Sequence, residues 1–108
     1  MTYPVYFTSA AMRDIEEIHA WIWEHDSKAN ADYVLDRLNS AAESIAELPF
    51  RGSRPRELPL AMEEDFRQVF FKPYRVIYQI RQADVIIHLI ADGRRNLKSR
   101  LVRRLTGN

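Results

Sequence analysis

Two long segments in the first half of the chain repeat apolar residues at the spacing of an amphipathic helix. Intervals of three and four residues bring side chains onto one helical face. The first stripe consists of Ala11, Ile15, Ile18 and Ile22, and the second of Val34, Leu38, Ala41, Ile45 and Leu48. We therefore predict a first helix capped by Ser9 and ending near His25, and a second ending before Pro49. Their short turn favours an antiparallel hairpin.

Four further segments have the composition of β-strands. They are Tyr3 to Thr8, Phe66 to Phe71, Tyr74 to Arg81 and Asp84 to Asp92. The last three are separated by only two residues each, which is short enough for hairpin turns, so an antiparallel meander is expected. Alternate residues of a strand share one face of the sheet. In the last strand the apolar set predicted for one face is Val85, Ile87, Leu89 and Ala91.

Residues 49–64 are interrupted by proline and glycine and are predicted to form an irregular connection. Beyond the last strand, Asn96 can cap a short terminal helix that Gly107 ends, and its apolar stripe is Leu97, Leu101 and Leu105. The predicted order is β-α-α-β-β-β-α. This is an α+β fold in which a helical hairpin packs on a mainly antiparallel four-stranded sheet, followed by a short C-terminal helix.

Length and composition favour a single globular domain over a membrane protein or a disulfide-stabilised protein. The 108 residues, 46% hydrophobic and 29% charged, suit a single globular domain spanning residues 1–108. No stretch approaches the roughly 18 apolar residues of a membrane helix, and no export signal is visible near Met1. The absence of cysteine excludes a disulfide framework and thiolate chemistry. We therefore expect a soluble, cytoplasmic protein without a membrane partner.

Charge is distributed unevenly along the chain, although the net charge is only +1. Residues 1–65 hold 6 Lys or Arg against 13 Asp or Glu, a net of −7, and residues 66–108 hold 10 against 2, a net of +8. Docking of the terminal leucine stripe would turn Lys98, Arg100, Arg103 and Arg104 outward as a cationic ridge, next to Arg94 and Arg95. Such a ridge could bind an acidic protein or DNA phosphates, although a basic helical face is more often simply solvated.

Several short sequence motifs occur along the chain in an order and spacing typical of one protein family. They are Ala11-Met12-Arg13-Asp14-Ile15 with Trp21-Ile22, then Gly52, Arg54, Arg56, Glu57 and Leu58, the strand Tyr74-Arg75-Val76-Ile77-Tyr78, and the exit Gly93-Arg94-Arg95-Asn96-Leu97. Together they resemble the ParE/RelE toxin superfamily over nearly the whole chain. The resemblance implies a toxin made beside an antitoxin whose disordered or helical segment wraps it. RelE-like members cut messenger RNA on the ribosome, whereas ParE-like members poison DNA gyrase.

Two departures from the RelE pattern favour the ParE-like branch. The catalytic tyrosine expected about six residues past the second arginine is replaced by Leu101, and the paired lysines before the Tyr74-Arg75 strand are absent. Arginine, with a pKa above about 12, is a poor general base for activating a ribose hydroxyl. We therefore expect no catalytic residue and a toxin that poisons DNA gyrase by direct binding. A ribosome-dependent messenger-RNA endonuclease and a non-toxic nucleic-acid-binding relative remain the alternatives.

The resemblance implies two partners, a ParD-like antitoxin in a hetero-oligomer and DNA gyrase, with DNA reached only through one of them. The predicted target-binding residues are Arg75, Arg94, Arg95, Lys98, Arg100, Arg103 and Arg104, and the predicted antitoxin-binding residues are Trp21, Trp23 and Arg67. Some of these residues also have a purely structural explanation. Arg75 could be an ordinary exposed strand residue or a paired structural arginine, and Trp21 and Tyr78 could belong to the core. His88 could be exposed or hydrogen-bonded within the fold rather than an acid–base group. No cofactor and no metal are expected.

Overall fold

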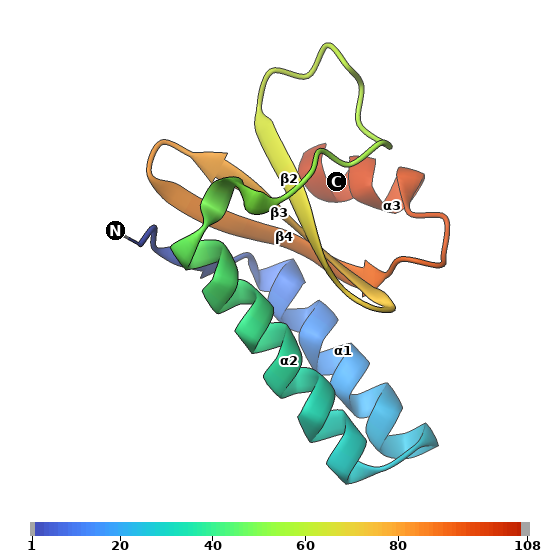
Figure 1. Ribbon diagram of the computed structural model, residues 1–108. Helices are drawn as coiled ribbons and strands as arrows, with labels where there is room; N and C mark the ends of the chain where they lie inside the picture. The colour runs from blue at the N-terminus through green and yellow to red at the C-terminus, as the bar shows by residue number, and fades with distance from the viewer. Residues whose placement is uncertain (1, 107–108) are drawn as a thin grey trace.

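The computed structural model describes residues 2–106 and has the predicted α+β order (Figure 1). Its elements are β1 (Val5–Phe7), α1 (Ser9–His25), α2 (Lys28–Glu47), the short 3₁₀ turn η1 (Pro49–Arg51), β2 (Asp65–Phe71), β3 (Tyr74–Arg81), β4 (Asp84–Asp92) and α3 (Lys98–Thr106). The predicted end of α3 at Gly107 lies outside the described residues. No helix within residues 2–106 is long and apolar enough to cross a membrane.

The strands form one sheet in the order β1-β4-β3-β2. The pairs β2–β3 and β3–β4 are antiparallel, as predicted, whereas β1 runs parallel to β4, so the sheet is mixed. Strand β1 is short and pairs only with Val85–Ile87. The later part of β4 therefore has an edge that β1 does not cover, and there the Ile90 amide donates to the Asp14 carboxylate of α1.

The helical hairpin covers one face of the sheet. The side chain of Thr8 caps α1 by accepting a hydrogen bond from the Ala11 amide at 3.0 Å, so the cap lies one residue before the predicted Ser9. Ser27 caps α2 in the same way. The apolar stripes of both helices join the inner face of the sheet in one buried cluster that includes Ile22, Leu38, Ile45, Tyr78 and Ile87. The far end of the hairpin extends past the sheet (Figure 1).

The opposite face of the sheet is covered by α3 and by part of the connection. Its buried cluster consists of Leu58, Phe66, Ile77, Leu89, Ala91, Leu97 and Leu101. The prediction that Val85, Ile87, Leu89 and Ala91 share one face is wrong. Tyr78 pairs with Ile87 while Ile77 pairs with Leu89, which leaves His88 as an extra residue. This bulge reverses the alternation, so one strand supplies apolar side chains to both cores.

The irregular connection is tied to the sheet although it lacks a helix or strand of its own beyond η1. The Tyr78 hydroxyl donates to the Pro49 carbonyl at 2.7 Å and accepts from the Gly52 amide at 3.1 Å. A Cβ added at Gly52 would lie 2.5 Å from that hydroxyl oxygen, so this position has no room for a side chain. Tyr78 is fully buried, as predicted, and fixes the start of the connection.

Candidate functional site

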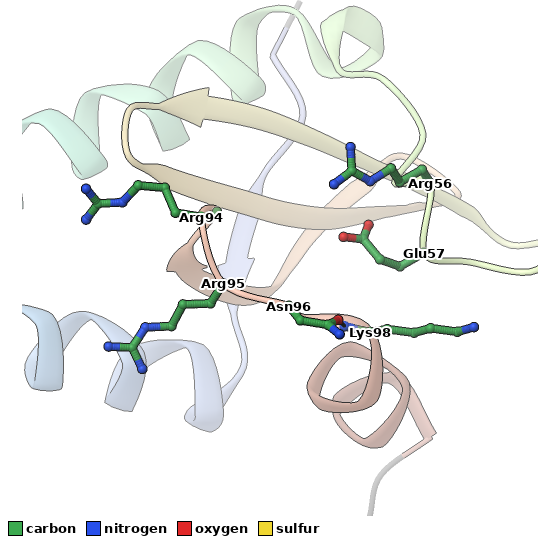
Figure 2. Close-up of a pocket in the computed structure, with 7 residues that line it drawn as sticks. Arg56, Glu57, Arg94, Arg95, Asn96 and Lys98 are labelled. Atoms are coloured by element: carbon green, nitrogen blue, oxygen red, sulfur yellow. Dashed lines mark hydrogen bonds between the residues drawn. The ribbon is translucent and has the colours of Figure 1, made fainter.

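A basic hollow of about 540 Å³ lies where the connection approaches the turn between β4 and α3 (Figure 2). It is lined by Arg56 and Glu57 from the connection and by Gly93, Arg94, Arg95, Asn96 and Lys98 from the segment that leaves β4. The docking of Leu97 and Leu101 on the sheet brings the start of α3 to this position. Two segments that are distant in sequence therefore form the opposing walls, and we call this site the basic hollow.

Most cations of the basic hollow are free to bind a ligand. Arg56, Arg95 and Lys98 are exposed, and none of them forms an ion pair with a carboxylate of residues 2–106. Arg94 is also exposed but binds Asp92 at 2.6 Å. Hydrogen bonds from this arginine hold the pKa of Asp92 below its usual value, and the same contact raises the pKa of Arg94. The hollow thus carries three exposed cations whose charged groups are not held in an ion pair within residues 2–106.

Arg75 lies beneath the hollow rather than on it. Its guanidinium is buried and makes a bidentate ion pair with Glu57, at 2.6 and 2.8 Å, and also donates to Gln68. This geometry fits the alternative in which Arg75 is a paired structural arginine, because an internal carboxylate occupies its hydrogen-bonding fork. The Arg75 hydrogen bonds also lower the pKa of Glu57. A Cβ at Gly93 would lie 2.7 Å from the Arg75 side chain, so the glycine makes room for it.

The expected cationic ridge on α3 is only partly present. Lys98 and Arg103 are exposed, but Arg104 turns inward and binds the buried carboxylate of Asp14 at 2.7 and 3.0 Å. Arg100, which is half-buried, reaches the same carboxylate at 3.1 Å. The outward orientation predicted for Arg104 is therefore wrong, and that of Arg100 holds only in part. A buried acid attracts these arginines because an unpaired charge there would be costly.

Asp14 was not identified from the sequence as a key residue. It also accepts a hydrogen bond from the Ile90 amide at 3.0 Å, on the β4 edge that β1 leaves uncovered. Asp14 thus joins α1, β4 and α3 at one carboxylate. A signal was available, because Asp14 is three residues after Ala11 and four before Ile18, so it lies beside the apolar stripe of the helix and needs a buried partner.

A second surface, a groove of about 340 Å³, runs between α1 and the end of β4. Its α1 wall includes Glu17, Ile18 and Trp21, and its other wall includes Arg94, Arg95 and Arg100. Trp21 is 61% exposed, so its assignment to the core is wrong. The structure therefore brings one predicted antitoxin-binding residue and three predicted target-binding residues together along this groove, which we call the α1–β4 groove.

The other two predicted antitoxin-binding residues lie elsewhere. Trp23 is 48% exposed and packs against His19, with the Lys28 ammonium 5.5 Å from its ring centroid. Arg67 is half-buried on β2 and uses its guanidinium internally, donating to Asp65 at 2.9 Å and to the Phe50 carbonyl at 2.8 Å. Arg67 therefore holds the connection in place and presents little free hydrogen-bonding capacity.

The remaining titratable groups do not form an acid–base centre at the hollow. His88 is partly buried and hydrogen-bonded to Gln79 at 2.9 Å. Burial lowers the pKa of His88, and the nearby charges of Arg81 and Arg104 lower it further. It does not line the basic hollow. Within residues 2–106, no group of three or more His, Cys, Asp or Glu side chains has a geometry that could hold a metal ion.

A helical hairpin on a mixed sheet, with a basic hollow at the exit of the last strand, defines a small α+β protein whose exposed cations suit an anionic partner. The sequence profile of the ParE toxin of type II toxin–antitoxin systems, parDE, matches residues 5–97. The chain therefore belongs to the ParE toxin family. Toxin ParE3 of Caulobacter vibrioides is 27% identical over 88 residues, which cover 82% of this chain and 84% of that protein.

Solved structures share the fold at lower sequence identity. A chain of the chromosomal ParDE toxin–antitoxin system of P. aeruginosa superposes with a TM-score of 0.71 at 15% identity, covering 84% of this chain and 96% of that one. A chain of the RelBE2 toxin–antitoxin complex of Mycobacterium tuberculosis superposes with a TM-score of 0.63 at 22% identity. The superposition covers 85% of this chain and 99% of that one. A substituted RelE toxin of E. coli in the free state superposes with a TM-score of 0.63 at 14% identity. The superposition covers 99% of this chain and 98% of that one. Both branches of the superfamily thus share this architecture.

Proposed function

We propose that this ParE-family toxin poisons DNA gyrase by direct binding, without catalysing a reaction, and that a ParD-like antitoxin neutralises it. The observation that carries the proposal is the basic hollow, where Arg56, Arg95 and Lys98 are exposed without an internal carboxylate partner in the described chain. Uncompensated charge at a surface favours rapid association with an acidic partner. Target binding therefore needs no rearrangement of internal ion pairs at these three residues.

The chemistry of the hollow supports a binding role over RNA cleavage. Cleavage needs a group to accept the ribose proton and another to protonate the leaving oxygen. Glu57 is the one carboxylate among the lining residues, and its lowered pKa makes it a weak proton acceptor. Leu101, at the position of the RelE-type tyrosine, is fully buried in the apolar cluster under α3. Arg75 is already engaged by Glu57.

The α1–β4 groove supports a mechanism of neutralisation. An antitoxin segment that packs on Trp21 would lie beside Arg94, Arg95 and Arg100, because these residues line the same groove. Exposed tryptophan is a common anchor of protein interfaces, and acidic side chains on the partner could pair with the arginines. Occupation of this groove would therefore cover part of the target-binding surface. The P. aeruginosa and M. tuberculosis relatives come from toxin–antitoxin systems, which supports an antitoxin partner here.

A paired assay on purified, antitoxin-free protein tests the proposal. DNA supercoiling by gyrase and cleavage of messenger RNA on translating ribosomes would be measured with the wild type and with an Arg56→Gln/Arg95→Gln/Lys98→Gln variant. We expect the wild type to inhibit supercoiling or trap DNA breaks, and the variant to require at least about tenfold more protein, equivalent to about 1.4 kcal/mol. Codon-phased RNA cuts with gyrase unaffected would contradict the proposal.

A further inference from the structure

We propose that the basic hollow binds the phosphodiester backbone of duplex DNA, so that the toxin contacts DNA directly. This inference rests on the proposed function for its cellular setting, in which gyrase holds the duplex. It differs from the expectation that DNA is reached only through gyrase or the antitoxin.

The charges of the hollow suit a ligand with several negative groups. Arg56, Arg95 and Lys98 come from two separate segments and form no ion pair within residues 2–106. The single acidic side chain in the lining, Glu57, is neutralised by Arg75. A lone carboxylate of a protein partner is satisfied by one guanidinium fork. Three free cations, with Arg94 beside them, therefore exceed what one carboxylate requires and suit a ligand that carries several phosphates.

The shape of the hollow also favours an extended anion. Its volume of about 540 Å³ is much greater than a carboxylate group needs. In Figure 2 the side chains of Arg94 and Arg95 extend in one direction and that of Lys98 in the opposite direction, so the cations do not converge on one point. Duplex DNA carries about one negative charge per 1.7 Å of helix axis. Cations that point in different directions can therefore contact separate phosphates of one extended ligand.

The composition of the lining favours a duplex over single-stranded RNA. None of the seven lining residues is aromatic. Single-stranded RNA and DNA are usually bound by stacking of exposed bases on aromatic side chains. The lining instead offers arginine, lysine and the Asn96 amide, which are typical phosphate-contacting groups. Binding should therefore depend on the backbone and show little dependence on base sequence.

Buried contacts hold the two walls of the hollow in position. The bidentate pair between Arg75 and Glu57 joins the connection to β3, and Arg56 is the residue next to Glu57. Gly93, on the opposite wall, packs against the Arg75 side chain and donates its amide to the Pro73 carbonyl at 2.7 Å. The site is therefore preorganised, which reduces the entropic cost of binding.

Fluorescence anisotropy with the full-length toxin tests the inference without gyrase. The probes are a labelled 20-base-pair DNA duplex and a single-stranded RNA of 20 nucleotides, each measured from 50 to 200 mM salt. For an Arg56→Gln/Arg95→Gln/Lys98→Gln variant, loss of three phosphate contacts should make the negative slope of log K against log salt shallower by about 2.7. The matched control, Arg13→Gln/Arg37→Gln/Arg81→Gln, removes three exposed charges away from the hollow and should bind within about twofold of wild type.

The outcomes separate this inference from the proposed function. Unchanged duplex affinity and salt slope in the hollow variant would overturn the DNA site, whatever happens to gyrase inhibition. Tighter binding of the wild type to the RNA than to the duplex would also overturn it, and so would an equal loss of affinity in the control variant. Selective loss of duplex binding in the hollow variant supports the site. If wild-type toxin then leaves supercoiling unaffected, the proposed gyrase poisoning fails while the DNA site stands.

Discussion

At the scale of single residues, Asp14 is a buried carboxylate that joins α1, β4 and α3. It is 4% exposed and accepts hydrogen bonds from Arg100, Arg104 and the Ile90 amide. We predict that Asp14→Asn lowers the free energy of unfolding by about 3 kcal/mol, because two arginines lose their buried counter-charge. Urea unfolding at neutral pH measures this change. Asp36→Asn, an exposed carboxylate on α2, should change stability by less than about 0.5 kcal/mol; equal effects would contradict the role of Asp14.

The titration of His88 leads to a second prediction, which concerns the pH dependence of stability. Burial, Arg81 and Arg104 lower its pKa in the folded protein below the ordinary value of 6.5. The unfolded chain therefore binds a proton first as the pH falls, and the stability present above pH 6.5 is lost as the pH drops towards the folded pKa. We expect His88→Gln to lose less stability than wild type between pH 7.5 and 5.5 in urea titrations.

The comparison of the two proteins isolates His88, because His19 and His25 are present in both. A glutamine at this position can also form a hydrogen bond to Gln79, which limits any structural change. Identical pH dependence in wild type and variant would mean that His88 titrates alike in the folded and unfolded states.

At the scale of elements, the irregular connection is held by side chains rather than by regular backbone pairing alone. Tyr78 forms hydrogen bonds to Pro49 and Gly52 at the start of the connection, and Arg75 forms an ion pair with Glu57 near the middle of the connection. We predict that Tyr78→Phe lowers the free energy of unfolding by about 1–2 kcal/mol, because it leaves the Pro49 carbonyl and the Gly52 amide without their partner. Hydrogen exchange should show faster exchange of the Gly52 amide.

A matched control for this element is Tyr33→Phe. The Tyr33 side chain is 56% exposed on α2, so removal of its hydroxyl should leave stability nearly unchanged. If Tyr78→Phe were as stable as Tyr33→Phe and its Gly52 amide exchanged at the wild-type rate, the tyrosine would not be the anchor of the connection.

At the scale of the whole molecule, the acidic first part and the basic last part meet at the α1–β4 groove. Glu17 and Trp21 lie on one wall and Arg94, Arg95 and Arg100 on the other. We predict that Trp21→Ala weakens binding of the cognate antitoxin by about 30-fold or more, roughly 2 kcal/mol, because an exposed aromatic anchor is lost. Isothermal titration calorimetry of purified toxin with antitoxin measures this change.

Trp23→Ala is the comparison for this prediction. Trp23 is similarly exposed but does not line the α1–β4 groove. A smaller loss of antitoxin affinity for Trp23→Ala would support the groove as the principal docking surface. The opposite order would transfer that role to the side of α1 that carries Trp23 and His19.

The sequence by itself determined the order of elements, the two helical stripes, the meander and the toxin superfamily. These features depend on local spacing: apolar residues at intervals of three and four define a helical face, and short breaks between β-rich segments define hairpins. The limits of the three meander strands were predicted to within one residue. The resemblance also depends on the order of short strings, which needs no knowledge of contacts.

The tertiary structure alone decided which charged and aromatic side chains are free. The sequence indicated that Arg75 and Arg104 could bind a target. In the structure Arg75 binds Glu57, which is 18 residues away in sequence, and Arg104 binds Asp14, which is 90 residues away. The bulge at His88 redirected Leu89 and Ala91 to the second core. Trp21 is exposed at the rim of the α1–β4 groove, whereas the adjacent Ile22 is buried in the core under the sheet. Such outcomes depend on contacts between distant segments, and the spacing of residues within one segment cannot specify them.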